Sequence, residues 1–307
     1  MKEPVIGQIK CPYLPPTQTF IHEFISHLEP ELNPLFTNKI INLKSFPYGN
    51  INYFKNLFML ESRLKEFGVC GLHAHFGHNG TFLLPLKMKL GLPMLTSFHG
   101  ADVSSRPKED SVYRKNLQEL FKQGELFTVV SEAMAQRVIR LGCPPEKIRV
   151  LHCGIDLKRI SYRPPANVPY QQATILSVGR LVEKKGMADL LEAMARVKAL
   201  RPKLSCRLLI VGEGPLERPL KQLSNKLGLA QEVSFLGVMS RTEIIRLLAE
   251  AQLFVLASRQ ASNGDAEGIP VALMEALAGG LPVITSNHEG IPELVRNRQN
   301  GLVVPEG

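Results

Sequence analysis

Two glutamates eight residues apart frame the segment Glu-Gly-Ile-Pro-Val-Ala-Leu-Met-Glu, which runs from Glu267 to Glu275. Pro270 suits the first turn of a helix and residues 271–277 are helix-forming, so we expect Glu267 just ahead of a helix and Glu275 inside it. The free N–H groups of a helix start attract phosphates. These nine residues alone also fit two solvated acids; together with the rest of the chain, they favour a site for a phosphorylated, hydroxyl-rich ligand.

Two cations lie five residues apart where another predicted strand ends. Arg180 and Lys185 follow a glycine turn in Ser177-Val-Gly-Arg-Leu-Val-Glu-Lys-Lys-Gly186. Both could face the helix start at Val271 and neutralise a diphosphate through charge-assisted hydrogen bonds of roughly 1.5–3 kcal/mol each. The alternative is a pair of surface cations, but a position near a helix start is unfavourable for cations, which favours a ligand.

The glycines of Gly212-Glu-Gly214 resemble half of a dinucleotide fingerprint. The third glycine is missing because Glu217 occupies its place, so the sequence argues against NAD or FAD. We expect these glycines to permit a close turn at a strand end.

Histidines are the remaining candidates for chemistry. His99 ends a predicted strand in a Phe-His-Gly turn and is expected to face the same site, although a packed or hydrogen-bonded histidine fits the pattern too. His73, His75 and His78 have no carboxylate or cysteine at ligand spacing, and the sequence contains no Asp-X-Asp. We therefore predict no metal site and no metal-bridged diphosphate.

The elements that position these residues alternate between strands and helices. At 307 residues the chain suggests two domains. In the first half, strands are predicted at 4–10, 39–43, 69–76, 94–98, 126–130 and 148–151, and helices at 20–28, 54–67, 80–90, 111–122 and 131–141, with Thr19 and Ser131 as caps. Short apolar strands separated by helices predict a parallel sheet covered on both sides.

A proline-rich connector from residue 156 to about 172 separates this half from a second alternation. There, strands are predicted at 174–178, 207–211, 233–236, 253–256, 282–285 and 302–304, and helices at 187–199, 216–227, 242–249, 271–278 and 291–296. The predicted fold is α/β: two tandem Rossmann-like, doubly wound domains, residues 1–165 and 166–307. Ligands of such sheets bind at the carboxyl ends of strands, so we expect the site in a cleft between the domains.

Composition narrows the function classes. The chain is 44% hydrophobic and 21% charged, as in ordinary soluble proteins, and carries a net charge of +9. The sequence contains no basic run with interleaved aromatic residues, so it gives no indication of nucleic-acid binding. Residues 1–165 hold a surplus of seven basic residues, which fits either peripheral contact with an anionic membrane face or a soluble protein with a mildly basic surface. Five scattered cysteines and the lack of a signal-peptide core predict a cytoplasmic protein.

With both motifs in view, the sequence resembles glycosyltransferase family 4, whose members are retaining GT-B-fold enzymes that use nucleotide sugars. The resemblance runs from Thr17-Gln-Thr-Phe-Ile21 to Asn300-Gly-Leu-Val-Val-Pro305. The EX7E segment from Glu267 to Glu275, together with Gly-Arg-X4-Lys-Gly, is a specific pair. The amino-acid sequence of residues 263–276 and 290–295 looks most like that of the colanic-acid-type exopolysaccharide members.

The resemblance implies roles on the donor side. Arg180 and Lys185 would hold the donor pyrophosphate, Glu275 the ribose hydroxyls, and Glu267 the sugar hydroxyls near the reacting carbon. The implied donor-binding residues are Arg180, Lys185, Gly212, Val238, Met239, Glu267, Ile269, Pro270, Val271, Ala272 and Glu275. Val238 and Met239 would line the base.

Further residues are implied on the acceptor side and in catalysis. The acceptor would enter the N-terminal domain near Thr17, Gln18, His75 and Asp102, and His99 would lie by the donor sugar. The implied catalytic residues are His99, Glu267, Arg180 and Lys185. Retention is explained in this family by front-face attack, in which a donor phosphate oxygen takes the acceptor proton. The expected ligands are a UDP- or GDP-linked sugar, with no cofactor, and a lipid-linked or oligosaccharide acceptor.

Two departures from the family pattern stand out. Where many members have a glycine-rich loop after the first strand, this chain has Pro-Pro-Thr-Gln-Thr at 15–19. Members usually continue past the last strand through several dozen residues, so we expect the C-terminal helices to be missing here.

The leading interpretation is a metal-independent hexosyltransferase of exopolysaccharide or envelope polysaccharide synthesis. A sugar-nucleotide epimerase of the same fold and an inactive nucleotide-sugar-binding fragment stay open as alternatives, because the fold does not decide the reaction.

Overall fold

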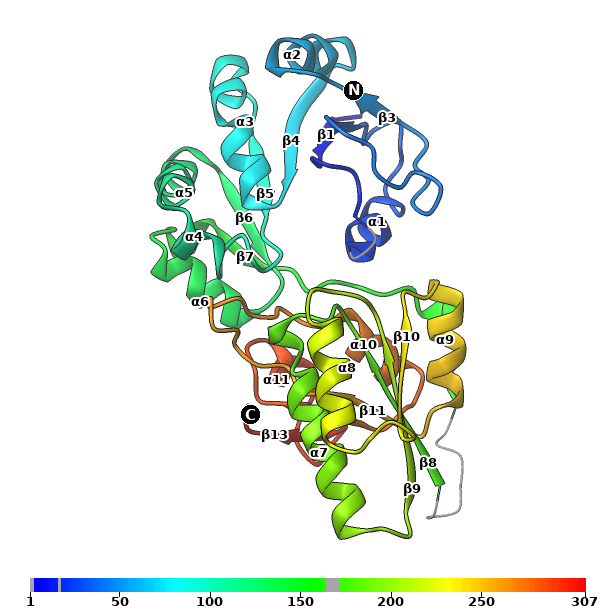
Figure 1. The fold of residues 1–307 in the computed structure, drawn as a ribbon. Helices are drawn as coiled ribbons and strands as arrows, with labels where there is room; N and C mark the ends of the chain where they lie inside the picture. The colour runs from blue at the N-terminus through cyan, green and yellow to red at the C-terminus, as the bar shows by residue number, and fades with distance from the viewer. Residues whose placement is uncertain (1–2, 16–17, 164–171) are drawn as a thin grey trace. The chain divides into compact units, whose positions relative to one another are not determined.

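The computed structural model describes residues 3–15, 18–163 and 172–307, and the chain divides into two compact units, Met1–Gly154 and Ile155–Gly307 (Figure 1). The division follows Gly154, whereas the proline-rich connector places it near residue 165 by sequence. Among the helices within the described ranges, none combines the length and the apolarity needed to cross a membrane.

The N-terminal unit is built on a seven-stranded, all-parallel sheet with the strand order β3-β2-β1-β4-β5-β6-β7. Its strands are β1 (Val5–Ile9), β2 (Leu35–Thr37), β3 (Ile51–Tyr53), β4 (Val69–His75), β5 (Met94–Ser97), β6 (Leu126–Val129) and β7 (Ile148–Val150). Its α-helices are α1 (Thr19–Ile25), α2 (Leu57–Glu66), α3 (Gly77–Leu90), α4 (Arg106–Glu109), α5 (Ser111–Gln123) and α6 (Glu132–Arg140). The order reverses between β1 and β4, which marks the switch point of a doubly wound sheet.

Local chemistry explains where these helices begin. Ser131 accepts a hydrogen bond from the Met134 N–H at the start of α6, as predicted, and Asp110 does the same for Tyr113 at the start of α5. Beneath the helices, Phe121 and Phe127 pack edge to face with ring centroids 5.4 Å apart.

The sequence predictions for this unit differ from the structure in three places. Residues 39–43 are not a strand: Ile40 forms an isolated bridge to Tyr13, and the second strand is β2, whose residues are fully buried. Thr19 does not cap α1, because Gln18 is the N-cap and Thr19 is already helical. The three-residue strand β3 was missed, so the sheet has seven strands rather than six.

The C-terminal unit repeats the same plan with a six-stranded, all-parallel sheet in the order β10-β9-β8-β11-β12-β13. Its strands are β8 (Gln172–Val178), β9 (Ser205–Val211), β10 (Val233–Gly237), β11 (Leu253–Leu256), β12 (Val283–Ser286) and β13 (Leu302–Val304). Its α-helices are α7 (Met187–Leu200), α8 (Glu217–Lys226), α9 (Arg241–Glu250), α10 (Val271–Ala278) and α11 (Ile291–Leu294), and a 3-10 turn, η3 (Glu183–Lys185), follows β8. The predicted tandem of parallel α/β units is confirmed, and the switch point here lies between β8 and β11.

Candidate active site

An ion pair between a buried glutamate and a partly buried lysine lies at the switch point of the C-terminal unit. Lys185, in the turn after β8, places its Nζ 2.9 Å from Oε1 of Glu267, in the loop after β11. Burial acts to raise the pKa of Glu267, but the charges of Lys185 and Lys184 outweigh it and hold that pKa below its usual value. Glu267 is therefore an anion at neutral pH, and the two predicted residues act as one charged unit.

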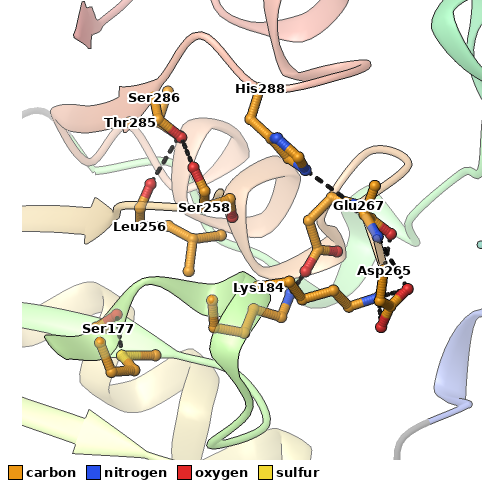
Figure 2. Close-up of polar contacts among 12 residues, drawn as sticks. Ser177, Lys184, Leu256, Ser258, Asp265, Glu267, Thr285, Ser286 and His288 are labelled. Carbon is orange, nitrogen blue, oxygen red and sulfur yellow. Dashed lines mark hydrogen bonds and ion pairs between the residues drawn. The ribbon is translucent and has the colours of Figure 1, made fainter. Parts of the chain in front are cut away.

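Lys184 fixes the loop that carries Glu267. It is a buried side chain, and its Nζ lies 3.1 Å from Oδ2 of Asp265 and donates to the carbonyl of Ala266 at 3.1 Å. Figure 2 shows Lys184 reaching across to Asp265 beside Glu267. Lys184 thus neutralises a loop carboxylate while its neighbour Lys185 faces the candidate site.

His288 holds the same loop from the opposite side (Figure 2). Its Nε2 accepts the backbone N–H of Glu267 at 3.1 Å, so its proton is on Nδ1, which donates to Oε1 of Glu306 at 2.5 Å. Two side chains of β12 bind the end of β11 and the residues after it, because Ser286 Oγ donates to the carbonyl of Ser258 and Thr285 Oγ1 donates to that of Leu256. The loop that carries Glu267 is therefore tied to β12 where it begins and to His288 where it ends.

The helix that follows, α10, begins with Pro270 as its N-cap, has no side-chain cap and has no acidic residue in its first turn. Its first N–H groups, at Val271 and Ala272, are among those that a helix start leaves without intrahelical partners. A helix start of this kind favours an anion, and the anion site expected here stays a prediction.

Glu275 lies inside α10, and its environment adds a residue that was not predicted. Its buried carboxylate Oε1 lies 3.1 Å from Nη2 of Arg241, the first residue of α9. The two glutamates of the motif are thus held by different elements, Glu267 by the turn after β8 and Glu275 by α9.

The other donor-side residues are placed as follows. Arg180 is exposed. In the described part of the chain, the cation paired with Glu267 is Lys185 and not Arg180. Val238, just after β10, is exposed, whereas Met239 packs against the core of the unit. Ile269 is half-buried in the loop before α10.

Two glycines allow the turns at this edge to pack. Gly186 has φ +62°, and a Cβ there would lie 1.7 Å from the carbonyl oxygen of Ala257. Gly212 has φ +132°, and its Cβ would lie 2.0 Å from the carbonyl oxygen of Gly179. Gly212 therefore permits contact between the turns that follow β8 and β9, and Gly186 seats the lysine turn against the end of β11.

In the N-terminal unit, His99 follows β5. Its ring lies 5.0 Å from that of Phe20 and 4.7 Å from that of Phe76, measured between centroids. Both of its ring nitrogens are buried without a hydrogen-bond partner in the described part of the chain, and burial lowers its pKa to about 3. His99 is therefore a neutral imidazole with uncommitted donor and acceptor atoms.

His75 lies beside it, with ring centroids 6.0 Å apart. Gln8 donates to Asn33 through its amide nitrogen, so its oxygen faces His75 and accepts from Nε2 at 3.1 Å. The Nδ1 of His75 is buried without a partner among the residues described.

Asp102 is buried and serves the backbone of its own unit. Its carboxylate accepts N–H groups from Gly77 at 2.9 Å, from His99 at 3.2 Å and from Gly100 at 2.9 Å. Asp102 thus joins the turn after β5 to the start of α3. Gln18 stands at the N-cap position of α1 without a side-chain hydrogen bond to the helix, and Thr17 lies outside the described residues. Within the described ranges, no three His, Cys, Asp or Glu side chains are grouped so as to hold a metal ion.

Lys184, Arg241 and His288 were missed by the sequence analysis. His288 follows the end of β12, so the strand-end rule that selected His99 also applies to it. Lys184 and Arg241 carried no signal, because nothing local tells a buried lysine from its neighbour or a helix-start arginine from a surface one.

Comparison with known proteins decides the family. Residues 23–159 match the family described as Glycosyltransferase Family 4, and residues 158–307 match the family described as Glycosyl transferases group 1. The chain belongs to the family 4 glycosyltransferases.

Named relatives of this chain include proteins named for exopolysaccharide biosynthesis. WcaL of Salmonella typhimurium, named for colanic acid biosynthesis, is 40% identical over 76% of this chain and 57% of its own length. The amylovoran biosynthesis glycosyltransferase AmsK of Erwinia amylovora is 38% identical over 86% of this chain and 66% of its own length. A GDP-mannose-dependent phosphatidylinositol monomannoside mannosyltransferase of Mycobacterium tuberculosis is 31% identical over 69% of this chain and 56% of its own length. The chain thus spans 56–66% of the length of these relatives.

Solved structures confirm the GT-B fold. Anabaena Alr3699/HepE in complex with UDP aligns with a TM-score of 0.81 at 17% identity, over 99% of this chain and 86% of HepE. WaaG, a glycosyltransferase involved in lipopolysaccharide biosynthesis, aligns with a TM-score of 0.67 at 19% identity, over 98% of this chain and 86% of WaaG.

Proposed function

We propose that this glycosyltransferase transfers a hexose, with retention and without a metal, from a nucleotide-diphosphate sugar to a saccharide acceptor in exopolysaccharide or envelope polysaccharide synthesis. The observation that carries the proposal is the Lys185–Glu267 ion pair, together with the start of α10, which has no side-chain cap. The names of WcaL and AmsK support the pathway class. HepE with bound UDP-glucose and the GDP-mannose-dependent relatives support a UDP- or GDP-linked donor.

The donor diphosphate would be held by Lys185, by Arg180 and by the N–H groups of Val271 and Ala272. These groups stabilise the negative charge that develops as the bond from the anomeric carbon to the phosphate oxygen breaks. The acceptor hydroxyl forms its bond to that carbon on the same face and gives its proton to the departing phosphate oxygen. This proposal needs orientation and fixed charges rather than a dedicated protein base.

Glu267 would bond sugar hydroxyls near the anomeric carbon, and Glu275 the ribose hydroxyls, held in place by Arg241. His99 is neutral at pH 7 and could donate to or accept from the donor sugar. Gln18, His75 and Asp102 remain predictions for the acceptor side, and a lipid-linked or oligosaccharide acceptor is part of the proposal.

The test is sugar-nucleotide turnover with and without a chelator. Glu275→Ala should lower kcat/KM for the donor about 10- to 100-fold, since a charged hydrogen bond contributes roughly 1.5–3 kcal/mol. Glu250→Ala is the matched control, because Glu250 pairs with exposed Arg246 on α9. Loss of turnover on chelation would contradict metal independence, and equal kcat/KM for both variants would contradict the ribose role. Conversion of donor without any acceptor would indicate an epimerase.

A further inference from the structure

The switch point of the N-terminal unit contains a buried lysine that the proposed mechanism does not use. Lys10 directly follows β1 and is 1% exposed. Its Nζ donates one hydrogen bond, to the carbonyl of Pro12 at 2.7 Å, and lies 5.1 Å from the centroid of the Phe76 ring. Phe76 is the N-cap of α3, so Lys10 lies where β1 and β4 end side by side, the place where doubly wound sheets bind ligands.

Lys10 differs from the other buried lysines of the described residues in having no carboxylate partner. Lys87 lies 2.6 Å from Glu125, and Lys184 lies 3.1 Å from Asp265. A buried ammonium that is neither paired nor fully hydrogen-bonded destabilises the fold, so it is retained where another group neutralises it. Two of the three N–H donors of Lys10 are left for such a group.

The titratable groups around Lys10 supply no negative charge. They are Cys11, His75, His78 and His99, with Arg106 acting on His78. Burial raises the pKa of Cys11 and lowers the pKa of each histidine, so all four are neutral near pH 7. Burial also lowers the pKa of Lys10 to about 8.

The helix beside Lys10 is already met by a carboxylate. The 14-residue helix α3 starts after Phe76, and its first N–H, that of Gly77, donates to Oδ2 of buried Asp102 at 2.9 Å, while Nε2 of His78 donates to the carbonyl of Cys11 at 3.2 Å. The ammonium of Lys10, rather than the start of α3, is therefore the group left to attract an anion.

We propose that Lys10 is the anchor for a phosphate group of the saccharide acceptor, such as the diphosphate of a lipid-linked sugar. The acceptor assignment rests on the proposed function, whereas the phosphate site does not. Because the ammonium is covered in the free protein, binding must uncover it locally. Phosphate binding then stabilises the protonated amine.

The direct test uses the full chain with 13C-labelled lysines, followed by NMR from pH 7 to pH 10 with and without inorganic phosphate. The Lys10 signal is assigned by its loss in Lys10→Met. Its midpoint should lie near 8 and rise by about one pH unit in saturating phosphate, which is a tenfold preference for the charged amine. The Lys87 signal is the internal control and should not respond. A Lys10 midpoint that phosphate leaves unchanged overturns the proposal.

Kinetics assign the source of the phosphate. Lys10→Met should raise KM for a diphosphate-linked acceptor about tenfold and leave the donor KM unchanged. The exposed Lys108, changed to Met, is the matched control. A rise in the donor KM alone, or no rise in either KM, contradicts the acceptor assignment even if phosphate binds. If the chain transfers no sugar at all, the proposed function is contradicted. The NMR result still decides whether Lys10 binds phosphate.

Discussion

The 2.9 Å pair between Lys185 and Glu267 joins two residues that the sequence singled out 82 positions apart. Their motifs could be found because the glycine turn and the helix start are local patterns. The residues that hold them, Lys184 and His288, could not be chosen in the same way, since their roles depend on which loops meet in space. At the residue scale, the sequence therefore predicted the candidate functional residues but not the residues that hold them in place.

Buried neutral histidines should make the protein sensitive to acid. Burial lowers the pKa of His73 and of His78 to about 4 and that of His99 to about 3, whereas an unfolded histidine titrates near 6.5. As pH falls below about 6.5, the unfolded chain takes up protons that the folded chain does not. Stability should therefore fall between about pH 6.5 and pH 4, by roughly 3 kcal/mol at most for each histidine.

Urea unfolding at several pH values measures this effect. His73→Gln should flatten the loss of unfolding free energy below pH 6.5 relative to the wild type. Equal pH slopes in the variant and the wild type would mean that His73 is not held neutral by the fold.

At the scale of elements, most helices and strands could be predicted because caps and apolar runs are local. Residues 39–43 misled because Ile40 and Ile41 look like strand residues but are 42% and 47% exposed. The true strand β2 and its neighbour β3 have three residues each, too few to show an alternation. Thr19 failed as a cap because α1 starts one residue earlier than predicted: the carbonyl of Gln18 accepts the N–H of Ile21 at 3.2 Å, which makes Thr19 the first helical residue.

The turn that carries Lys185 depends on Gly186. Gly186→Ala should lower the free energy of unfolding by more than about 2 kcal/mol and weaken donor binding, because it adds a clash with the Ala257 carbonyl to the strain of a positive φ. Gly228→Ala is the control, since Gly228 has φ +69° and nothing within 4 Å of its added Cβ. That change should lower the free energy by only about 1 kcal/mol. Equal losses, measured by chemical unfolding, would mean that the contact with Ala257 is unimportant.

At the scale of the whole molecule, both units use a parallel sheet whose order reverses beside its first strand. The sequence predicted this repeated plan from the alternation of strands and helices, and the family comparisons agree with it. The strand orders explain why the strongest candidates, Lys185 and Glu267 in one unit and Lys10 in the other, lie just after the strands that flank a switch point.

The uneven charge of the chain predicts salt-sensitive binding to membranes. Residues 1–165 carry the surplus of seven basic residues, so binding to vesicles with anionic lipid should weaken strongly as salt rises. Vesicle sedimentation at low and high salt measures it, with neutral vesicles as the control. Binding that is independent of salt, or equal to neutral vesicles, would contradict an electrostatic contact.

The most direct test of the central claim is calorimetric binding of UDP and of GDP to the wild type, Lys185→Met and Lys198→Met. Lys198 is the matched control, because it also pairs with a glutamate, Glu232, at 2.6 Å. We predict that Lys185→Met weakens binding of the preferred nucleotide about 10- to 100-fold while Lys198→Met leaves it unchanged. Binding by folded Lys185→Met that equals the wild type would contradict a diphosphate site built on the Lys185–Glu267 pair.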